Sequence, residues 1–385
     1  MNETGAGIME LPAELLEFKA VVRRFIDEQV IPHEKDGEMS PEVLARVLAQ
    51  MKDLGIWAAN VPAEFGGAGL GALGYLMVSE EICRTTLWLP LYSAGNAMLV
   101  LTLGTEEQKQ RYLYPSVTGD RLGCFALTEP QGGSDPGGTM RTEAHFDGTN
   151  WTLNGRKTFI TFGNTADYAL VFAVTDRTKR QHGGITLFLV DKGTEGFSVV
   201  RSIQTMGEHR PVELDFHDVV VSDAQRLGEV GEGFVMAQRV LGGARAFIGA
   251  YAVGVCSRLL DMAVDYTQER EAFGKPLSEH GQVQAVLADC AIELEACRWL
   301  TYRAGAEAER GGDTRILDSI VKVYASELVS RVSDKILQIH GGWGYSKDLP
   351  IERFYRDSRF FRIAEGPNEV HRMLISRELV KGRRP

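Results

Sequence analysis

The chain has 385 residues, of which 44% are hydrophobic, and a formal net charge of −10. This acidic balance argues against nucleic acid or an anionic membrane surface as the main partner, because such surfaces attract clustered Lys and Arg side chains. The five cysteines form no CxxC pair, so they predict neither a disulfide framework nor a zinc site and favour a reducing compartment.

Helical spacing dominates the first part of the chain. Apolar side chains recur at intervals of three and four over residues 15–25, which predicts a first helix that ends at Pro32. Ser40 and Pro41 are a favourable N-cap and first-turn pair and predict the start of a second helix. We therefore expect a helical N-terminal domain over residues 1–120.

The apolar period changes to two after residue 121, which predicts a separate β domain over residues 121–232. Asn154-Gly155, inside an alternating segment, is a strong hairpin-turn signal and predicts a turn there. Four further alternating or continuously apolar segments, each bounded by Gly, Asp or Thr, predict additional strands. They cover residues 168–176, 185–191, 197–203 and 212–221.

Three long helical segments and a short final helix follow in residues 233–385. In the middle segment, Cys290 and Cys297 lie on an apolar stripe typical of an antiparallel bundle and are predicted to be core residues. The final helix is expected to have Gly366 as N-cap and Pro367 in its first turn. Its predicted buried residues are Val370, Met373 and Leu374. The fold class is therefore α+β, with a helical domain, a β-barrel or sandwich domain and a C-terminal four-helix bundle.

Residues 128–135, TEPQGGSD, place polar side chains around a glycine pair. A Rossmann loop requires GxGxxG between a strand and a helix, whereas strand-like sequence follows here, so this loop is not of that type. A plain glycine-rich turn is the alternative interpretation. The block closely resembles the flavin-binding signature TEPxxGSD of the acyl-CoA dehydrogenase family, and the predicted order of helices, strands and bundle is also that of this family.

Glu365 directly precedes the predicted final helix, where free backbone N–H groups favour negative charge. By itself it could be a capping carboxylate on a solvated turn. The resemblance implies more, since family members carry their catalytic glutamate in an EG segment at this place. A minority branch has its base directly before an arginine of the bundle, and here that position is Ala244, ahead of Arg245. The resemblance thus implies that Glu365 is the catalytic base.

The resemblance also implies cofactor contacts. Residues 125–134 match the segment that lines the flavin, residues 159–161 match a segment usually led by tryptophan, and Arg270 and Phe273 match residues that touch the FAD of a neighbouring subunit. The implied FAD contacts are Phe125, Leu127, Thr128, Gly133, Ser134, Phe159, Ile160, Thr161, Arg270, Phe273, Gln338, Ile339, Gly341, Gly342, Pro367 and Asn368. The implied substrate contacts are Ser134, Arg245 and Gly366. No histidine pair has metal-ligand spacing, so no metal site is predicted.

The implied activity is FAD-dependent α,β-dehydrogenation of an acyl-CoA thioester to the trans-2-enoyl-CoA. Glu365 would take the α proton, FAD the β hydride, and an electron-transfer flavoprotein the electrons. An oxidase or flavin monooxygenase on the same scaffold, or a catalytically silent acyl-CoA- or flavin-binding subunit, are the alternatives. The resemblance further implies a homo-oligomer, either a dimer or a tetramer. With no basic and apolar leader and no run of ~18 apolar residues, we expect a cytoplasmic protein without a membrane span.

Overall fold

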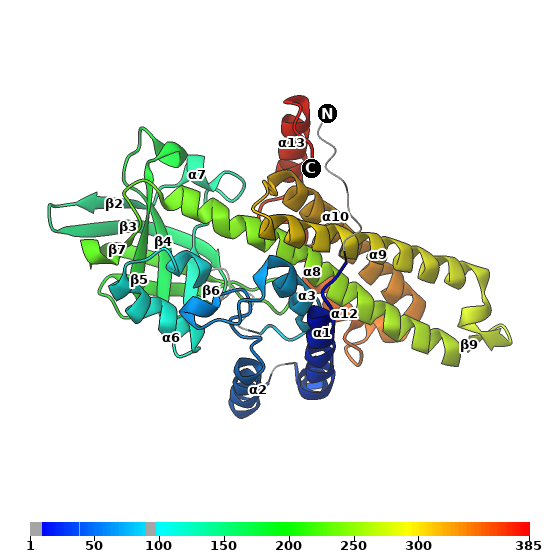
Figure 1. The fold of residues 1–385 in the computed structure, drawn as a ribbon. Helices are drawn as coiled ribbons and strands as arrows, with labels where there is room; N and C mark the ends of the chain where they lie inside the picture. Colours follow the sequence, from blue (N-terminus) through cyan, green and yellow to red (C-terminus); the bar gives the residue numbers. More distant parts are fainter. Residues whose placement is uncertain (1–9, 38, 90–97) are drawn as a thin grey trace.

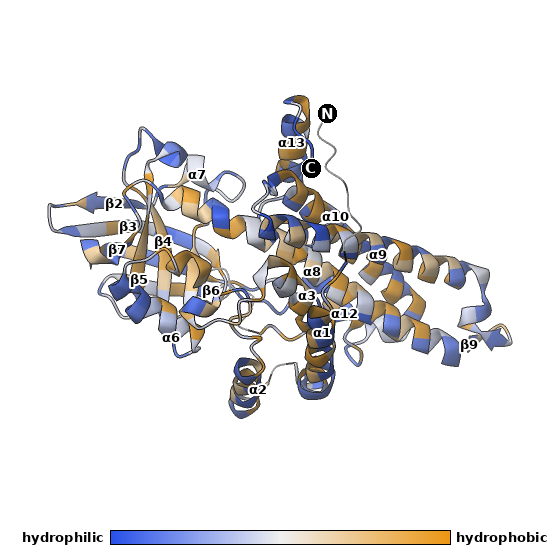
Figure 2. Ribbon diagram, in the orientation of Figure 1, coloured by the Kyte–Doolittle hydropathy of each residue, from blue (hydrophilic) through white to orange (hydrophobic). Residues whose placement is uncertain are grey.

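The computed structural model describes residues 10–37, 39–89 and 98–385. It places a β domain at one end of the molecule and a bundle of long helices at the other, and the N-terminal helices pack against both (Figure 1). Hydrophobic residues concentrate on the central strands and along the inner helices (Figure 2). The two ends therefore each have an apolar core, as expected for a chain of this length.

The N-terminal helices form largely where helical spacing predicts them. Ser40 caps α2 as predicted, since its Oγ accepts a hydrogen bond from the backbone N–H of Val43 at 3.3 Å. The prediction that Pro32 ends the first helix is wrong: the chain stays helical through it, because Pro32 lies in the first turn of η2, where no N–H is needed. The elements are α1 (Ala13–Phe25), η1 (Ile26–Val30), η2 (Ile31–Asp36), α2 (Pro41–Asp53), η3 (Ala63–Phe65), α3 (Gly71–Ile82), α5 (Glu106–Gln108), η4 (Lys109–Leu113) and α6 (Tyr114–Val117).

The β domain is an eight-stranded mixed sheet with strand order β6-β7-β3-β2-β4-β5-β8, and β1 pairs in parallel with β4. The four predicted later strands are confirmed as β4 to β7. All seven residues of β4 are buried, because both faces of this strand are covered by apolar cores. The strands are β1 (Gly123–Ala126), β2 (Glu143–Phe146), β3 (Asn150–Ile160), β4 (Tyr168–Val174), β5 (Ile185–Asp191), β6 (Phe197–Ser202), β7 (Val212–Ser222) and β8 (Arg226–Leu227).

The predicted hairpin turn at Asn154-Gly155 is wrong, because β3 runs straight through both residues. The turn lies instead between β2 and β3, where the Asp147 carboxylate accepts two backbone N–H groups at 2.8 Å. Gly155 marks a bulge opposite β7, and a Cβ there would lie 2.4 Å from Oγ1 of Thr142. The glycine thus permits a close approach of two strands and does not form a turn.

The C-terminal region contains the three predicted long helices, with Cys290 and Cys297 buried as predicted. By length and composition α8 could cross a membrane, but 61% of its most apolar window is buried inside the protein, as in a core helix. It packs against α3, α9 and α10. The elements are α8 (Gly233–Glu269), β9 (Glu271–Ala272), β10 (Lys275–Pro276), η7 (Leu277–Glu279), α9 (Gly281–Glu309), α10 (Arg315–His340), α11 (Gly342–Tyr345), α12 (Ile351–Ser358), η8 (Arg359–Arg362) and α13 (Asn368–Val380).

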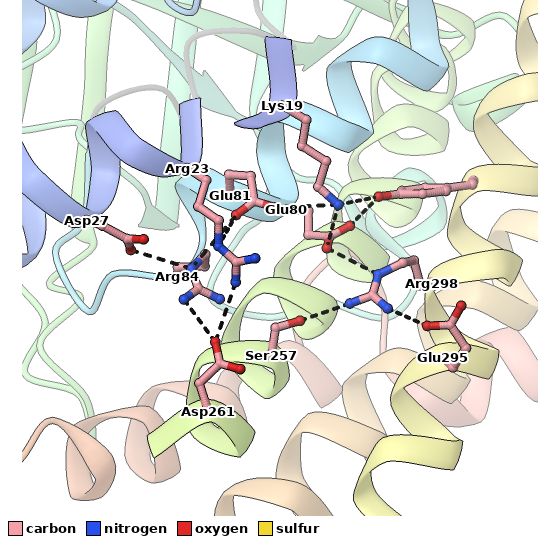
Figure 3. Close-up of polar contacts among 11 residues, drawn as sticks. Lys19, Arg23, Asp27, Glu80, Glu81, Arg84, Ser257, Asp261, Glu295 and Arg298 are labelled. Carbon is pink, nitrogen blue, oxygen red and sulfur yellow. Dashed lines mark hydrogen bonds and ion pairs between the residues drawn. The ribbon is translucent and has the colours of Figure 1, made fainter. Parts of the chain in front are cut away.

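A buried polar network ties the N-terminal helices to this bundle (Figure 3). The Glu80 carboxylate on α3 lies 2.8 Å from the Lys19 ammonium of α1 and 3.2 Å from Arg298 of α9, and it also accepts the Tyr302 hydroxyl proton. The side chain of Glu80 is only 4% exposed. Because a buried carboxylate requires such partners, the network fixes α1, α3 and α9 in one relative position.

Candidate active site

Glu365 lies in the turn between η8 and α13. The structure starts α13 at Asn368 with Pro367 as N-cap, one residue later than predicted from the sequence. Glu365 has a left-handed backbone with φ 55°, and Gly366 follows with φ 95°. A left-handed conformation at a residue with a side chain is strained, and such strain persists only where neighbouring groups enforce it.

Two buried side chains hold this turn by its carbonyl groups. Nε2 of His371 lies 3.0 Å from the Glu365 carbonyl oxygen. The Lys322 ammonium donates to the Gly366 carbonyl at 2.6 Å and to Oδ1 of Asn368 at 2.7 Å. His371 belongs to α13 and Lys322 to α10, so the turn is fixed from two helices at once.

The electrostatic environment favours a carboxylate that can exchange a proton. Burial raises the pKa of Glu365, while the positive charges of Arg245 and Lys322 oppose this shift. Burial likewise lowers the pKa of Arg245, and its Nε is buried without a hydrogen-bond partner in the described part of the chain. Burial also raises the pKa of Asp318, a neighbour of Arg245, to about 6. Glu365, Arg245 and Gly366 are therefore brought together, as the sequence predicts.

The buried face of α13 is polar, and its predicted apolar face is wrong. Met373 is 63% exposed, and the residues that α13 buries are Asn368, His371 and Glu378. The reason is the facing helix α10, which presents Lys322 and other polar side chains to α13. Apolar periodicity cannot identify a helix that packs through hydrogen bonds.

A second site segment, residues 128–135, follows β1. Its Glu129 is buried and pairs with the fully buried Lys157 of β3 at 2.9 Å. The same carboxylate accepts the backbone N–H groups of Arg141 and Thr142, and Lys157 also donates to the Leu127 carbonyl. These bonds fold the segment back onto β3 and leave Gly133 and Ser134 exposed beyond it.

The end of β3 lies directly beside this segment, since the N–H of Thr158 donates to the Thr128 carbonyl at 2.9 Å. Phe159 follows with a left-handed φ of 56° and is 59% exposed. The hydroxyl of Thr161 contacts Nε2 of His209 at 3.1 Å, and the His209 ring stacks on Trp88 with centroids 4.7 Å apart. Thr128, Phe159 and Thr161 therefore border one region, as the sequence predicts.

Four of the other predicted residues have side chains that already pack against or bond to neighbouring residues. Leu127 and Ile160 are buried in apolar cores, so any ligand contact from them comes from the main chain. Asn368 is buried and bonded to Lys322, Ser326 and Glu327. Phe125 is half-buried and packs on Phe172 at 4.8 Å.

The remaining predicted residues gather at the far end of α8. Arg270 caps this helix, and it lines a groove together with Tyr266, Leu277 and residues 339–343. Phe273 is 98% exposed and also has a left-handed φ, of 52°. Twenty-five residues of α8 separate Arg245 from Arg270, which corresponds to about 38 Å along the helix. The groove is therefore remote from Glu365 within one chain.

Several residues of the site were not predicted from the sequence: His371, Lys322, Lys157, Glu129 and His209. For Lys322 a signal exists, because Ser319, Lys322, Ser326 and Ser333 form a polar stripe at helical spacing on an otherwise apolar helix, and all four are fully buried. For Lys157 the signal is the alternation of β3. Lys157 lies four residues after Leu153 and six after Trp151, so it falls on the same buried face of the strand. His209 has no comparable signal.

Comparison with known proteins identifies the family. Residues 12–120, 124–219 and 231–380 match the N-terminal, middle and C-terminal domain models of acyl-CoA dehydrogenases. The chain is 35% identical over 380 residues to an acyl-CoA dehydrogenase of Bacillus subtilis, covering 97% of this chain and 100% of that protein. The chain belongs to the acyl-CoA dehydrogenase family.

Two further members of the acyl-CoA dehydrogenase family are similarly close. The CarC subunit of the caffeyl-CoA reductase-Etf complex of Acetobacterium woodii is 36% identical over 386 residues, which cover 99% of each protein. The structure of butyryl-CoA dehydrogenase from Megasphaera elsdenii has a TM-score of 0.89 and 34% identity, covering 97% of this chain and all of that one. The predicted fold class is thereby confirmed, and the chain is an oxidoreductase of a flavoprotein family.

The described residues fit a flavin dinucleotide of the kind this family binds. Cβ atoms at Gly341 or Gly342 would meet nothing within 4 Å, which leaves room for a ligand against the backbone. The Arg270 guanidinium has no partner within the described residues and presents two donors at the spacing of phosphate oxygens. Phe159, Phe273 and Glu365 carry left-handed backbones at the three predicted contact regions, where strain often marks function.

Proposed function

We propose that the protein catalyses FAD-dependent α,β-dehydrogenation of an acyl-CoA thioester to the trans-2-enoyl-CoA. The observation that carries this proposal is the environment of Glu365: a carboxylate with a raised pKa, in a strained turn held by His371 and Lys322, at the N-terminus of a helix. The identity of the chain as a family member with intact Glu365 argues against a catalytically silent subunit.

Glu365 serves as the base in this proposal. Removing a proton next to a thioester carbonyl requires a base whose pKa approaches working pH, in a site that excludes water. Burial supplies the shift, and the cations Arg245 and Lys322 keep the carboxylate ionised enough to accept a proton. Backbone N–H groups at the start of α13 favour the developing negative charge on the thioester oxygen. Bound FAD would supply the two-electron acceptor for the hydride of the β carbon.

We infer that the cofactor site is shared between subunits. Thr128, Ser134, Phe159 and Thr161 would hold the flavin half, while Arg270, Phe273 and residues 338–342 would hold the other half. About 38 Å of helix separates Glu365's neighbour Arg245 from Arg270, farther than one extended dinucleotide reaches. A second copy of the chain therefore has to supply Arg270 and Phe273, which accounts for a phenylalanine that is 98% exposed in one subunit.

The proposed electron acceptor is an electron-transfer flavoprotein, and the support is the similarity to CarC, which belongs to an Etf complex. A straight short acyl chain is supported by the butyryl-CoA dehydrogenase structure. Ala364 and Phe159, however, stand where many family members have tyrosine and tryptophan, which indicates a wider pocket and favours a branched, substituted or cyclic acyl group over that straight chain.

The test is anaerobic mixing of the purified protein with a panel of acyl-CoA esters while the flavin absorbance is followed. We expect bleaching by at least one ester, loss of bleaching by about 10³-fold or more in Glu365→Gln, and unchanged bleaching in the matched control Glu369→Gln, an exposed carboxylate four residues along. Bleaching that survives Glu365→Gln contradicts the proposal. Rapid reoxidation by air, in place of an electron-transfer flavoprotein, would support the oxidase alternative.

A further inference from the structure

We propose that Lys322 and His371 are positioning residues for the reaction: they hold the carbonyl groups of Glu365 and Gly366 and so aim the carboxylate and the adjacent backbone N–H groups at the substrate. This inference rests on the proposed function and deepens it. Neither residue touches the substrate in this scheme. They act through Glu365 and Gly366.

The first step of the argument is backbone strain. A non-glycine residue in the left-handed region is strained, because its Cβ crowds the following carbonyl oxygen, and Glu365 has φ 55°. The free turn would relax and swing the carboxylate away. The 3.0 Å contact from His371 holds the carbonyl of Glu365 itself, and the 2.6 Å contact from Lys322 holds the carbonyl of the next residue, Gly366, whose φ is also positive. They are therefore placed to oppose this relaxation.

The second step concerns the protons of His371. Its Nε2 faces the Glu365 carbonyl, which can only accept, so Nε2 carries the proton. Its Nδ1 lies 3.1 Å from Oγ of Ser319, whose hydroxyl also lies within hydrogen-bond distance of the Arg315 carbonyl, at 2.9 Å. Burial lowers the pKa of His371 to about 4, so the ring is neutral at pH 7 and this single tautomer is maintained. His371 thus acts through geometry and not through charge.

The third step concerns Lys322, which is fully buried and has no role in the apolar core. Its ammonium donates to the Gly366 carbonyl and to Oδ1 of Asn368, and the Ser326 hydroxyl donates to the same Oδ1. Burial lowers the pKa of Lys322 to about 8, so it stays largely protonated at pH 7 and its charge opposes protonation of Glu365. Lys322 therefore acts through both geometry and charge.

These different roles make the inference testable with four variants. His371→Leu removes the donor, His371→Gln restores an N–H at a similar position, and Lys322→Met removes both donor and charge. Arg372→Leu is the matched control, because Arg372 also ties α13 to α10, through Glu327 at 2.7 Å, without reaching the Glu365 turn. Flavin content and thermal midpoint are measured for each variant, so that misfolding is recognised.

The probe is an acyl-CoA with sulfur in place of the β carbon. This compound can lose its α proton to Glu365 but has no β hydride to give, so its enolate accumulates and is seen as long-wavelength absorbance beside oxidised flavin. Titration against pH reports deprotonation separately from oxidation. Steady-state kcat and KM with an acyl-CoA substrate are measured in parallel.

We expect His371→Leu to lower kcat about 10- to 100-fold with KM within about twofold of wild type, and His371→Gln to recover most of the loss. Lys322→Met should show a similar loss and also move the pH midpoint of enolate formation upward by at least ~0.5 unit. If Lys322→Met does not fold, Lys322→Gln takes its place with the same expected upward shift. Arg372→Leu should behave as wild type.

The inference is overturned if His371→Leu keeps wild-type kcat, if His371→Gln is no better than His371→Leu, or if the pH midpoint stays unchanged when the charge of Lys322 is removed. Failure of the proposed function looks different: wild-type protein would then form no enolate with the probe, or Glu365→Gln would form it as well. A wild-type signal that depends on Glu365 but not on His371 or Lys322 rejects the positioning role alone.

Discussion

Replacing Lys157 by methionine should destabilise the β domain strongly and expose the 128–135 segment. The substitution removes the cation that pairs with the buried Glu129 and leaves the Leu127 carbonyl without the Lys157 donor. Burial alone would raise the pKa of Glu129, but the Lys157 ammonium and the hydrogen bonds outweigh it and lower that pKa. Removing one member of a buried ion pair costs about 3–5 kcal/mol, since a charge is left without compensation.

Hydrogen exchange over residues 123–160 measures this loss without requiring the whole protein to unfold in one step. A cost of about 3–5 kcal/mol corresponds to exchange that is faster by roughly two hundred- to five thousand-fold, at 1.36 kcal/mol for each factor of ten. The same methionine substitution at the exposed Lys192 is the control and should change stability by no more than ~0.5 kcal/mol.

A double-mutant cycle with Glu129→Gln separates the pair from its surroundings. The combined Lys157→Met, Glu129→Gln variant should be less destabilised than the sum of the single variants by at least ~2 kcal/mol, because no unpaired charge remains in it. Additive effects, or a Lys157→Met variant within about 1 kcal/mol of wild type, would refute the view that this ion pair holds the segment on β3.

Three other changes test the structure at separate places. Arg258→Leu removes the cation and the two 2.7 Å bonds that Arg258 gives to the buried Glu34 side chain and should lower the free energy of unfolding by about 3–5 kcal/mol; an effect as small as that of the exposed Arg24→Leu would count against this. Burial raises the pKa of Asp318 to about 6, above its ordinary value of 3.8, so the folded state binds an extra proton and stability falls as pH rises from about 4 to 6; Asp318→Asn should flatten the dependence of the thermal midpoint on pH in this window, and equal slopes would contradict it. Phe159→Gly relieves a left-handed backbone worth about 1 kcal/mol and should keep or raise the thermal midpoint while weakening FAD binding; a lower midpoint with FAD affinity retained would assign the ring a purely structural role.

The sequence predicts elements well where one period holds over many residues. The continuously apolar β4 and β5, the largely alternating β7 and the long apolar stripes of α9 and α10 identify those elements, because each buries its apolar residues against a neighbour. The prediction of a turn at Asn154-Gly155 is wrong for a physical reason. Glycine satisfies a turn, a bulge and a close strand approach equally well, and only the position of Thr142 shows which one applies.

The site is predicted in part for a similar reason. Glu365 and Arg245 belong to motifs, and the structure brings them together. Their supports, Lys322 and His371, are polar residues on helices whose burial depends on packing between distant segments. The polar stripe on α10 marks Lys322 as unusual, but no local pattern assigns either residue to the Glu365 turn. The polar face of α13 is the plainest case, since hydrogen bonds to α10 replace the apolar contacts that periodicity seeks.

Because helix α8 is uninterrupted, it limits where residues can be inserted into or deleted from this chain. It is continuous from its contact with β5 at Gly233, past Arg245, to Arg270. One inserted residue between Arg245 and Arg270 would advance everything beyond it by 1.5 Å and rotate it by about 100° around the axis. The groove at the far end would then face a different direction from the turn that carries Glu365. We therefore expect insertions and deletions to be tolerated in exposed connections such as residues 310–313. The length of α8 between Arg245 and Arg270, in contrast, sets both the distance and the relative orientation of the groove and the Glu365 turn.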